Sequence, residues 1–573
     1  MNMNKLLCLL LALFLLTSCL LTVGCDEQTP PSENETQADD NNNDNSDNSE
    51  DNYMLGNIQA TAADYTIIRS ETATKIIKNA VILARNTIEA AIGSKLEVAE
   101  DWVEDKRSEH EILIGETNRP ESAEAMKTLS SDVPYAVTQI NGKICLVGLD
   151  EYSVRRAVYE FLTVYFGYEV PNYNYHNVID YGAEGDGVRD ETESFRAAVA
   201  AAMADGLPVY VPAGTYVISD TIELDQVTMY GYHSGAWTAD NSDLPVIVQT
   251  NLEAPAFDVI SGSLSGFLIE VKGVSKDMDF TPAETVRLSC AGARVSNLKI
   301  YDPYIAISTF YDGGANPGRC FIENIFIVNP YEIGVYVHST WDVATLCNIE
   351  VWNPHTSGAN KNSCSVAYKF GKNDDLRAVN LFTFNAKIGF LFEESDIGGG
   401  VFEGCWGSFT NCSTDLCETG LKVDKGQHAL TIIGGTYWNH FYGLYVTEKT
   451  SATTRVTMSG CELKTNGSTS TVTIAGGQMV TVTGCNISRT QSGHNGIPVK
   501  ITAGTGVTIS GNTICANGTA GIDIASGFKG AAAVTGNTII TSSATAVGAI
   551  SGKAVEGRVV IEGNAVITNY KYE

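Results

Sequence analysis

Several carboxylate side chains lie between residues 319 and 440, whereas few follow residue 500. Two carboxyl groups about 5–9 Å apart can hydrolyse a glycosidic bond, because one donates a proton while the other activates water or attacks the sugar. Repulsion between them raises the pKa of one, which supplies the protonated acid. Asp342 and Asp374 are the first candidates for such a pair, and Glu350 and Asp375 are further candidates.

Two arginines and a histidine lie among these carboxylates. Arg319 and Arg377 can hold a uronate or serve as the base of a β-elimination, and His440 can carry a proton. Taken singly, each of these residues is more typical of a solvated or hydrogen-bonded turn than of a catalytic site. Their concentration between residues 319 and 440 is what indicates a site.

Large aromatic residues occur in the same segment. Sugar rings stack on aromatic planes, so an outward aromatic band predicts a saccharide-binding surface, since such a band is rarely left to water. The alternative is that the insertions at 303–320 and 354–368, or the N-terminal region, simply cover the band. Besides Phe326 and Phe384, its members are the predicted substrate-binding residues Trp352, Phe382, Trp406 and Trp438.

A repeat positions these residues. A Gly or Asn recurs about every 24 to 35 residues before a short strand, and a period of this length is typical of a stacked solenoid. The sequence therefore predicts a right-handed parallel β-helix from residue 176 to residue 573. The repeating positions are Gly231, Gly266, Asn297, Asn324, Asn348, Asn380, Gly404, Gly434, Gly460, Gly484, Gly511, Gly536 and Gly563.

Side chains alternate along each strand, so this register separates an inward face from an outward one. The first residue after the repeating position should point inward, which makes Cys405, Cys461 and Cys485 core thiols rather than metal ligands. The fifth residue should point inward as well, in a structural stack. Its members are Asp302, Asn329, Asn353, Asn385 and Asn439. Cys405, Cys412 and Cys417 are also close enough in sequence for a local disulfide.

Residues 54–175 alternate strand and helix patterns. Strands are expected at 65–68, 111–114 and 143–147, and helices at 73–92 and 153–166. With Ile114-Gly-Glu-Thr-Asn-Arg119 and Gly148-Leu-Asp150, this segment resembles the small domain that precedes the catalytic domain of hexosaminidases. The resemblance implies no catalytic residue here.

The segment from Asn177 to Thr192, which contains Tyr181-Gly-Ala-Glu-Gly-Asp186-Gly-Val-Arg-Asp190, is followed by a helix and by Val209-Tyr-Val-Pro212-Ala-Gly214. It resembles the opening of the pectate lyase superfamily, which includes family 28 glycoside hydrolases. The physical expectation is a helix capped by Asp190 that covers the open end of the solenoid, where strand edges would otherwise be exposed. The usual family 28 motifs are incomplete, because only Asn373-Asp374-Asp375 resembles their paired aspartates. The resemblance thus implies the fold more than the reaction.

The N-terminus predicts export and a lipid anchor. Lys5 precedes an uncharged run, 6–16, that is too short to span a bilayer. Thr22-Val-Gly-Cys25 follows and resembles a lipobox, with Cys19 as the alternative lipidated residue. Residues 26–53 form an acidic tether without Lys or Arg, which keeps the chain extended from a bacterial cell-envelope membrane. The net charge of −30 disfavours nucleic acid as a partner.

The leading hypothesis is a glycoside hydrolase acting on a complex or uronate-containing polysaccharide, with Asp342 and Asp374, or Glu350, as acid and base. A second hypothesis is a polysaccharide lyase or epimerase with Arg377 or His440 as base, in which Ca²⁺ could bind Asp342, Asp374 and Asp375. Hydrolysis requires no metal or cofactor. A third hypothesis is a non-catalytic glycan-binding or adhesive solenoid.

Overall fold

The computed structural model describes residues 55–103, 107–130, 133–168, 174–233, 244–275, 278–354, 364–489, 497–516, 520–541, 550–552 and 558–568. The predicted signal peptide, its Cys25 and nearly all of the acidic tether lie outside these ranges. Among the described residues, no helix combines the length and the apolar character needed to cross a bilayer.

Residues 55–168 contain a five-stranded sheet in the order β2-β1-β3-β5-β4, in which only β4 is antiparallel to its neighbour. The predicted strands and helices are present within two residues, whereas β2 and β4 were not predicted. Arg119 is buried and forms an ion pair with buried Glu111, with Nε and Oε2 3.0 Å apart. Arg119, from the motif that suggested the hexosaminidase resemblance, thus holds this sheet together. The elements are α2 (Ile58–Thr61), β1 (Thr66–Arg69), α3 (Lys75–Ile92), β2 (Val98–Glu100), β3 (Glu111–Ile114), α4 (Pro120–Met126), β4 (Tyr135–Ile140), β5 (Lys143–Gly148) and α5 (Glu151–Phe166).

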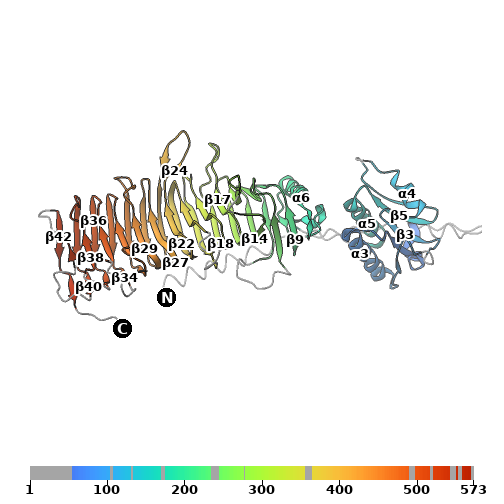
Figure 1. The fold of residues 1–573 in the computed structure, drawn as a ribbon. Coiled ribbons are helices and arrows are strands. Elements are labelled where there is room, and N and C mark those ends of the chain that lie inside the picture. Colours follow the sequence, from blue (N-terminus) through green and yellow to red (C-terminus); the bar gives the residue numbers. More distant parts are fainter. Residues whose placement is uncertain are drawn as a thin grey trace, which may run out of the picture. The chain divides into compact units, whose positions relative to one another are not determined.

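The rest of the chain is a parallel solenoid, as the sequence predicts (Figure 1). Helix α6 (Thr192–Asp205) lies at its first rungs, and Asp190 accepts a hydrogen bond from the backbone N–H of Thr192 at 3.0 Å. Phe195 on α6 is fully buried against the solenoid core. The strands of the first rungs are β6 (His176–Asn177), β7 (Asp186–Asp190), β8 (Val209–Tyr210), β9 (Gly214–Ile218), β10 (Ile222–Asp225), β11 (Thr228–Tyr230), β12 (Pro245–Gln249), β13 (Phe257–Ile260), β14 (Ser263–Val271) and β15 (Glu284–Leu288).

Each rung contributes to three sheets. The first sheet lies before the repeating Gly or Asn, the second lies directly after it, and the third follows a second turn. The middle strands are β16 (Arg294–Tyr301), β17 (Ile305–Thr309), β18 (Phe321–Val328), β19 (Ile333–Val337), β20 (Ala344–Trp352), β21 (Val366–Phe370), β22 (Asn373–Phe384), β23 (Ile388–Phe392), β26 (Cys405–Thr410), β27 (Ser413–Val423), β28 (Ala429–Ile433) and β29 (Thr436–Val446).

The last rungs repeat the same pattern with shorter segments. Their strands are β30 (Arg455–Ser459), β31 (Glu462–Thr465), β32 (Val472–Ile474), β33 (Met479–Thr483), β34 (Asn486–Arg489), β35 (Val499–Ile501), β36 (Gly506–Ser510), β37 (Thr513–Ala516), β38 (Ile522–Ile524), β39 (Ala531–Thr535), β40 (Thr538–Thr541), β41 (Ile550–Ser551), β42 (Val559–Glu562) and β43 (Ala565–Ile567).

The bend between the first and second sheets explains the repeating residue. In the middle rungs this residue is an asparagine with φ near +55°, and in the late rungs it is a glycine with φ near +65°. Asparagine and glycine tolerate this left-handed conformation better than other residues. The asparagine side chains also bond to one another, as Asn380 Nδ2 does to Asn348 Oδ1 at 3.1 Å.

One rung was predicted out of register. Asn380 stacks on Asn411, not on Gly404, because Val379 pairs with Thr410. The bend residue of this rung is therefore Asn411, with φ of +54°. The error arose because the long turn before β26 contains glycines of its own.

The inward columns are largely as predicted. Cys461 and Cys485 are buried, and Asn353, Asn385 and Asn439 are buried as well. Asp302 is exposed instead, which corrects its inward assignment. All eleven described cysteines are free, so the possible disulfide among Cys405, Cys412 and Cys417 is wrong.

Candidate functional site

Several predicted site residues lie at the solenoid edge where the third sheet turns into the first. Two turns at this edge are long: residues 310–320 after β17, and residues 393–404 after β23, which contain the hairpin β24 (Ser395–Asp396) and β25 (Phe402–Glu403). Both project from the same side of the solenoid (Figure 1). Between them, Asp342 lies in the shorter turn before β20, and Asp374 is the second residue of β22. We call the two long turns together with these two residues the edge site.

Asp342 is partly exposed and paired with a cation. Its Oδ2 lies 2.6 Å from Arg319 Nε, and its Oδ1 accepts the backbone N–H of Val343 at 2.8 Å. The Val343 N–H first, and then Arg319, hold the pKa of Asp342 below its usual range. Asp342 is therefore ionised near neutral pH, which suits a base rather than a proton donor.

Asp374 shares one lysine with a second carboxylate. Lys372 is almost fully buried, and its Nζ contacts Asp374 Oδ1 at 2.5 Å and Glu403 Oε2 at 2.9 Å. Because both oxygens touch one nitrogen, the two carboxyl groups lie within about 5 Å of each other, a separation also found between glycosidase carboxylates. Lys372 and Glu403 were not predicted. Lys372 directly precedes Asn373-Asp374, but Glu403 lies in the turn whose register was misread.

Asp375 points away from this lysine and pairs with Arg377, with Oδ2 and Nη2 2.7 Å apart. The register slips between Asn373 and Leu376, and Asp375 adopts a φ of +54°. This irregularity separates the two adjacent carboxylates, as strand alternation predicts for consecutive residues. Both Asp375 and Arg377 are more than half exposed.

Asp342 and Asp374 belong to neighbouring rungs, as predicted. Ala344 pairs with Leu376 two residues beyond each of them, and the Asp374 N–H bonds to the Thr340 carbonyl at 3.2 Å. Neighbouring rungs are about 4.8 Å apart, so carboxyl separations of about 5–9 Å are within reach of these side chains. In the described part of the chain, no group of three or more His, Cys, Asp or Glu side chains forms a metal site, so Asp342, Asp374 and Asp375 do not make up a Ca²⁺ site.

Aromatic side chains border the edge site. Trp341 packs against Tyr311 of the first long turn, with ring centroids 4.6 Å apart. Trp406 and Phe402, on the other side, are both about half exposed. Trp406 pairs with Ala429 in the first sheet, so its assignment to the same band as Trp352 is wrong. The misread register caused this error, and Trp406 instead follows directly after Cys405, the partner of Asn373.

The remaining predicted residues lie on a different surface, the outward face of the second sheet. Phe326, Glu350 and Phe382 form one row across β18, β20 and β22. Glu350 is half-buried between the two rings, and this burial raises the pKa of its carboxyl. Phe326 is buried, so part of the predicted band is covered.

A second row on this face runs through Trp352, Phe384, Asp415, Trp438 and Lys464. The Trp352 and Phe384 rings stack with centroids 4.6 Å apart. Trp438 is exposed, and Lys464 Nζ lies 4.5 Å from the centroid of its ring. His440 lies two residues after Trp438 on β29, with Nδ1 3.1 Å from Asn466 Oδ1. The sequence predicted one surface, whereas the residues occupy two.

The outward face of the third sheet was not predicted to carry any site residue. Tyr336 stacks on His338 with ring centroids 4.2 Å apart, and Lys369 lies over the same tyrosine at 4.9 Å. Lys369 also pairs with Glu393 at 3.2 Å. Burial lowers the pKa of His338 to about 4, so this imidazole is neutral at physiological pH. The repeat analysis placed only the second sheet in register, so this face gave no signal.

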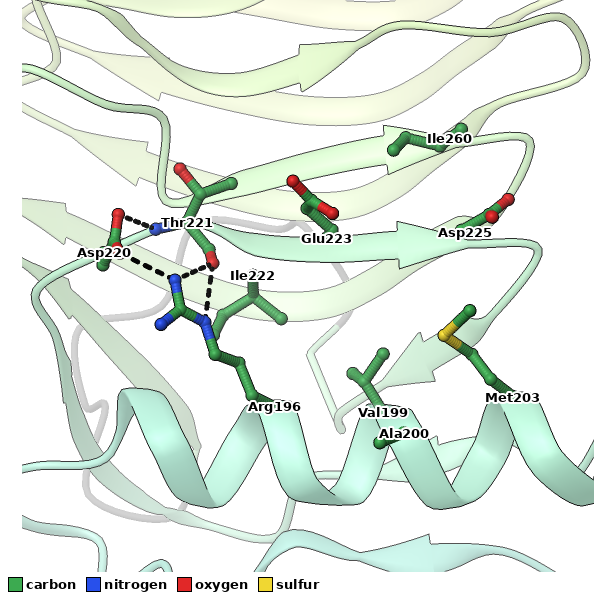
Figure 2. A pocket seen from close by; sticks show the side chains of 10 residues that line it. All are labelled: Arg196, Val199, Ala200, Met203, Asp220, Thr221, Ile222, Glu223, Asp225 and Ile260. Carbon is green, nitrogen blue, oxygen red and sulfur yellow. Dashed lines mark hydrogen bonds and ion pairs between the residues drawn. The ribbon is translucent and has the colours of Figure 1, made fainter.

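An open pocket of about 710 Å³ lies beside α6 (Figure 2). Arg196 enters it and pairs with Asp220 at 2.7 Å, and Met203 of α6 is exposed at its side. Glu223 and Asp225 of β10 lie on the opposite side. The pocket contains none of the predicted site residues.

Comparison with known proteins supports the fold. Residues 175–242 match the family model "Rhamnogalacturonase A/epimerase, pectate lyase-like", and residues 425–572 match "Right handed beta helix region". A glucan 1,3-beta-glucosidase of Cochliobolus carbonum is 35% identical over 106 residues, which cover 16% of this chain and 12% of that protein.

Similar solved structures include a tailspike protein of Escherichia coli bacteriophage HK620 in complex with a pentasaccharide (9% identity, 69% of this chain and 78% of that chain, TM-score 0.45). Others are a GH87 alpha-1,3-glucanase from Streptomyces thermodiastaticus (15%, 70% and 71%, TM-score 0.39) and the A-module of the Azotobacter vinelandii mannuronan C-5 epimerase AlgE6 (16%, 68% and 99%, TM-score 0.35). The family matches and the rung-by-rung parallel pairing together identify the solenoid as a pectate lyase-like right-handed β-helix.

Proposed function

We propose that this protein hydrolyses a polysaccharide at the edge site, with Asp342 as the base and Asp374 as the proton donor. The observation that carries this proposal is the pair of carboxylates on neighbouring rungs in different electrostatic surroundings. Asp342 has its own arginine and a backbone N–H, whereas Asp374 shares one lysine with Glu403. Environments that differ in this way assign the acid and the base of a carboxylate pair.

The contacts of Asp342 fit the base. A depressed pKa keeps its carboxylate ionised over the working range of pH, so that it can take a proton from the attacking water. Arg319, largely exposed on the first long turn, orients it.

The position and exposure of Asp374 fit the acid. Asp374 and Glu403 contact the same ammonium group, which fixes the two carboxyl groups close together. Asp374 is about 39% exposed, so a leaving-group oxygen can approach it. Lys372 is a positioning residue, because it holds both carboxyl groups in place.

The substrate class follows from charge and shape. Exposed rings of Trp406 and Phe402 can stack on sugars beside the carboxylates. The net charge of −30 disfavours a polyanionic substrate, so a neutral glycan is favoured over a uronate. The glucan 1,3-beta-glucosidase similarity makes a β-1,3-glucan the first substrate to test.

The test is a screen of neutral and pectic polysaccharides for new reducing ends and for absorbance from unsaturated products. The wild-type protein should release reducing ends without that absorbance, and Asp374→Asn should lower the rate at least a hundredfold. Asp523→Asn is the matched control, because Asp523 makes an outward hydrogen bond to Ser551 in a late rung. An equal rate in Asp374→Asn and the control would refute the site.

The second candidate is elimination or epimerisation of a uronate. It is favoured by the family description that covers residues 175–242. Unsaturated products in the same screen would select elimination, although Arg377 would first have to leave Asp375 to act as a base. Glycan binding without any turnover would favour the third hypothesis, a non-catalytic glycan-binding solenoid.

We also infer that the protein is exported and lipid-anchored through Cys25, and that residues 54–175 are hexosaminidase-like in origin. The short apolar run and the lipobox-like sequence support the anchor. Fatty-acid labelling in a bacterial host should occur in the wild type and disappear in Cys25→Ser. Labelling that persists until Cys19 is also changed would assign the lipid to Cys19.

A further inference from the structure

The outward face of the second sheet from β20 to β31 is separate from the edge site. Its two rows are defined by strand pairing and lie after the asparagine bend, whereas Trp406 and Arg377 lie before it. A ligand on this face would therefore contact a different sheet from the one that carries Asp374. The face takes no part in the proposed hydrolysis.

Aromatic rings on this face are partly open to solvent. Trp438 is 41% exposed, and its ring is supported by Lys464. Phe384, two rungs earlier, and Trp352, three rungs earlier, form a stacked pair with an interplanar angle of 17°. Rungs are about 4.8 Å apart, so Phe384 and Trp438 offer two platforms about 10 Å apart along the solenoid axis.

Polar groups accompany the rings. Asp415 lies between Phe384 and Trp438 in the same row, and Glu350 lies in the neighbouring row. Among the described residues, the Glu350 carboxyl has no hydrogen-bond or ion-pair partner, although it is half-buried between Phe326 and Phe382. A carboxyl group with unused hydrogen-bonding capacity beside aromatic rings matches the alternating apolar faces and hydroxyl edges of a sugar.

The charges on the face select against anionic ligands. Between β20 and β31 its outward carboxylates are Glu350, Asp415 and Glu462, whereas its outward lysine, Lys464 on β31, already lies over the Trp438 ring. A uronate would meet repulsion here, but an uncharged sugar would not.

We propose that this face is a second, non-catalytic binding surface for a neutral polysaccharide, with Trp438 and the Trp352–Phe384 pair as its ring platforms. It would hold the polymer on the solenoid while the edge site acts on another stretch. The proposal stands without the proposed hydrolysis, because binding is measured independently of turnover.

The test uses the full-length protein carrying Asp374→Asn, so that cleavage does not consume the probe. Affinity electrophoresis with laminarin, a neutral β-1,3-glucan, with galactomannan and with polygalacturonate gives the dissociation constants. At least one neutral polymer should bind and polygalacturonate should not. Trp438→Ala should weaken neutral binding at least tenfold.

Two controls separate this surface from the edge site and from unfolding. Thr513→Ala alters an exposed residue of the same sheet in a late rung and should bind like the parent. Trp406→Ala, made without Asp374→Asn, should lower turnover of short oligosaccharides while leaving polymer binding within twofold. The proposal is overturned if no neutral polymer binds, if polygalacturonate binds more tightly, or if Trp438→Ala and Trp352→Ala both bind like Thr513→Ala.

Discussion

The middle rungs, β16 to β29, and the late rungs, β30 to β43, share one backbone pattern but differ in where they place amide side chains. In the middle rungs the ladder lies outside, at the bend, where Asn324, Asn348, Asn380 and Asn411 are exposed. In the late rungs the bend residue is glycine, and the ladder moves one residue on, into the core, as Asn512, Asn537 and Asn564.

The outward surfaces of the middle rungs and the late rungs also differ. Between β18 and β29 the outward rows contain tryptophan, phenylalanine and charged residues, and the turns include two long excursions. In the late rungs an outward row of the second sheet contains Asn486, Thr513 and Thr538 instead. The difference teaches that the fold of the solenoid does not depend on the candidate site residues. The middle rungs, which contain those residues, are stabilised by the same kind of inward columns as the late rungs, which do not.

Among the substitutions that test this comparison, Lys372→Met in the middle rungs should have the largest effect, which is on turnover. The ammonium group that joins Asp374 to Glu403 is lost, so both carboxylates lose their position beside the hairpin. We expect turnover to fall about a hundredfold, since the proton donor is no longer held in position for the substrate. Steady-state kinetics would show the change; Lys500→Met, on an exposed late-rung lysine, should leave turnover unchanged.

In the late rungs, Asn537→Ala should be the most destabilising ladder substitution. The Asn537 side chain accepts the buried Asn512 N–H at 3.0 Å and donates to the Ile509 carbonyl at 2.9 Å. Leaving such groups unpaired costs about 3 kcal/mol in the free energy of unfolding. Denaturant unfolding measures this value, and a loss below about 1 kcal/mol would show that the inner ladder is dispensable.

The outer ladder should matter less. Asn380→Ala loses exposed hydrogen bonds and places alanine at φ of +55°, which costs about 1–2 kcal/mol. Asn380→Gly relieves the backbone strain but also lacks the amide, so the difference between the two variants isolates the strain. Equal stability of Asn380→Ala and Asn380→Gly would contradict the assignment of strain to this bend.

The smallest effect is expected from moving the outer ladder into the late rungs. A Cβ at Gly484 or Gly511 would meet no atom closer than 3.9 Å, so Gly484→Asn with Gly511→Asn has room and a permitted φ. The free energy of unfolding should change by about 0.5 kcal/mol or less, because a new exposed hydrogen bond between the amide side chains offsets the cost of replacing glycine at a positive φ. Gly484→Val is the contrasting control, since a β-branched residue is disfavoured at positive φ.

The fold could be predicted well because every rung of the solenoid requires the same residue types at the same positions. Each bend needs Gly or Asn, and each inward column needs an apolar or amide residue, so Cys461 and Asn385 were assigned correctly. The placement of Asp342 and Asp374 in neighbouring rungs was also predicted correctly. Register failed only where a long turn carries glycines of its own, and this misplaced Trp406.

The composition of the candidate site could be predicted only in part. Glu403 reaches Lys372 through a hairpin whose length is not part of the repeat, so no periodic pattern relates it to Asp374. The division between the edge site and the second-sheet face also depends on which side of one bend a residue lies. Sequence distance does not reveal that, because Leu376 and Leu381 lie on different sheets only five residues apart.

The pH dependence of kcat/KM for Asp342→Asn against the wild type tests the central claim most directly. The lowered pKa of Asp342 predicts that the acid limb of the wild-type rate lies below the usual titration range of an aspartate, where the base takes up a proton. Asp342→Asn should lose at least a hundredfold in rate, and its residual activity should lack this acid limb. A variant that retains both the wild-type rate and the wild-type acid limb would contradict the assignment of the base and, with it, catalysis at the edge site.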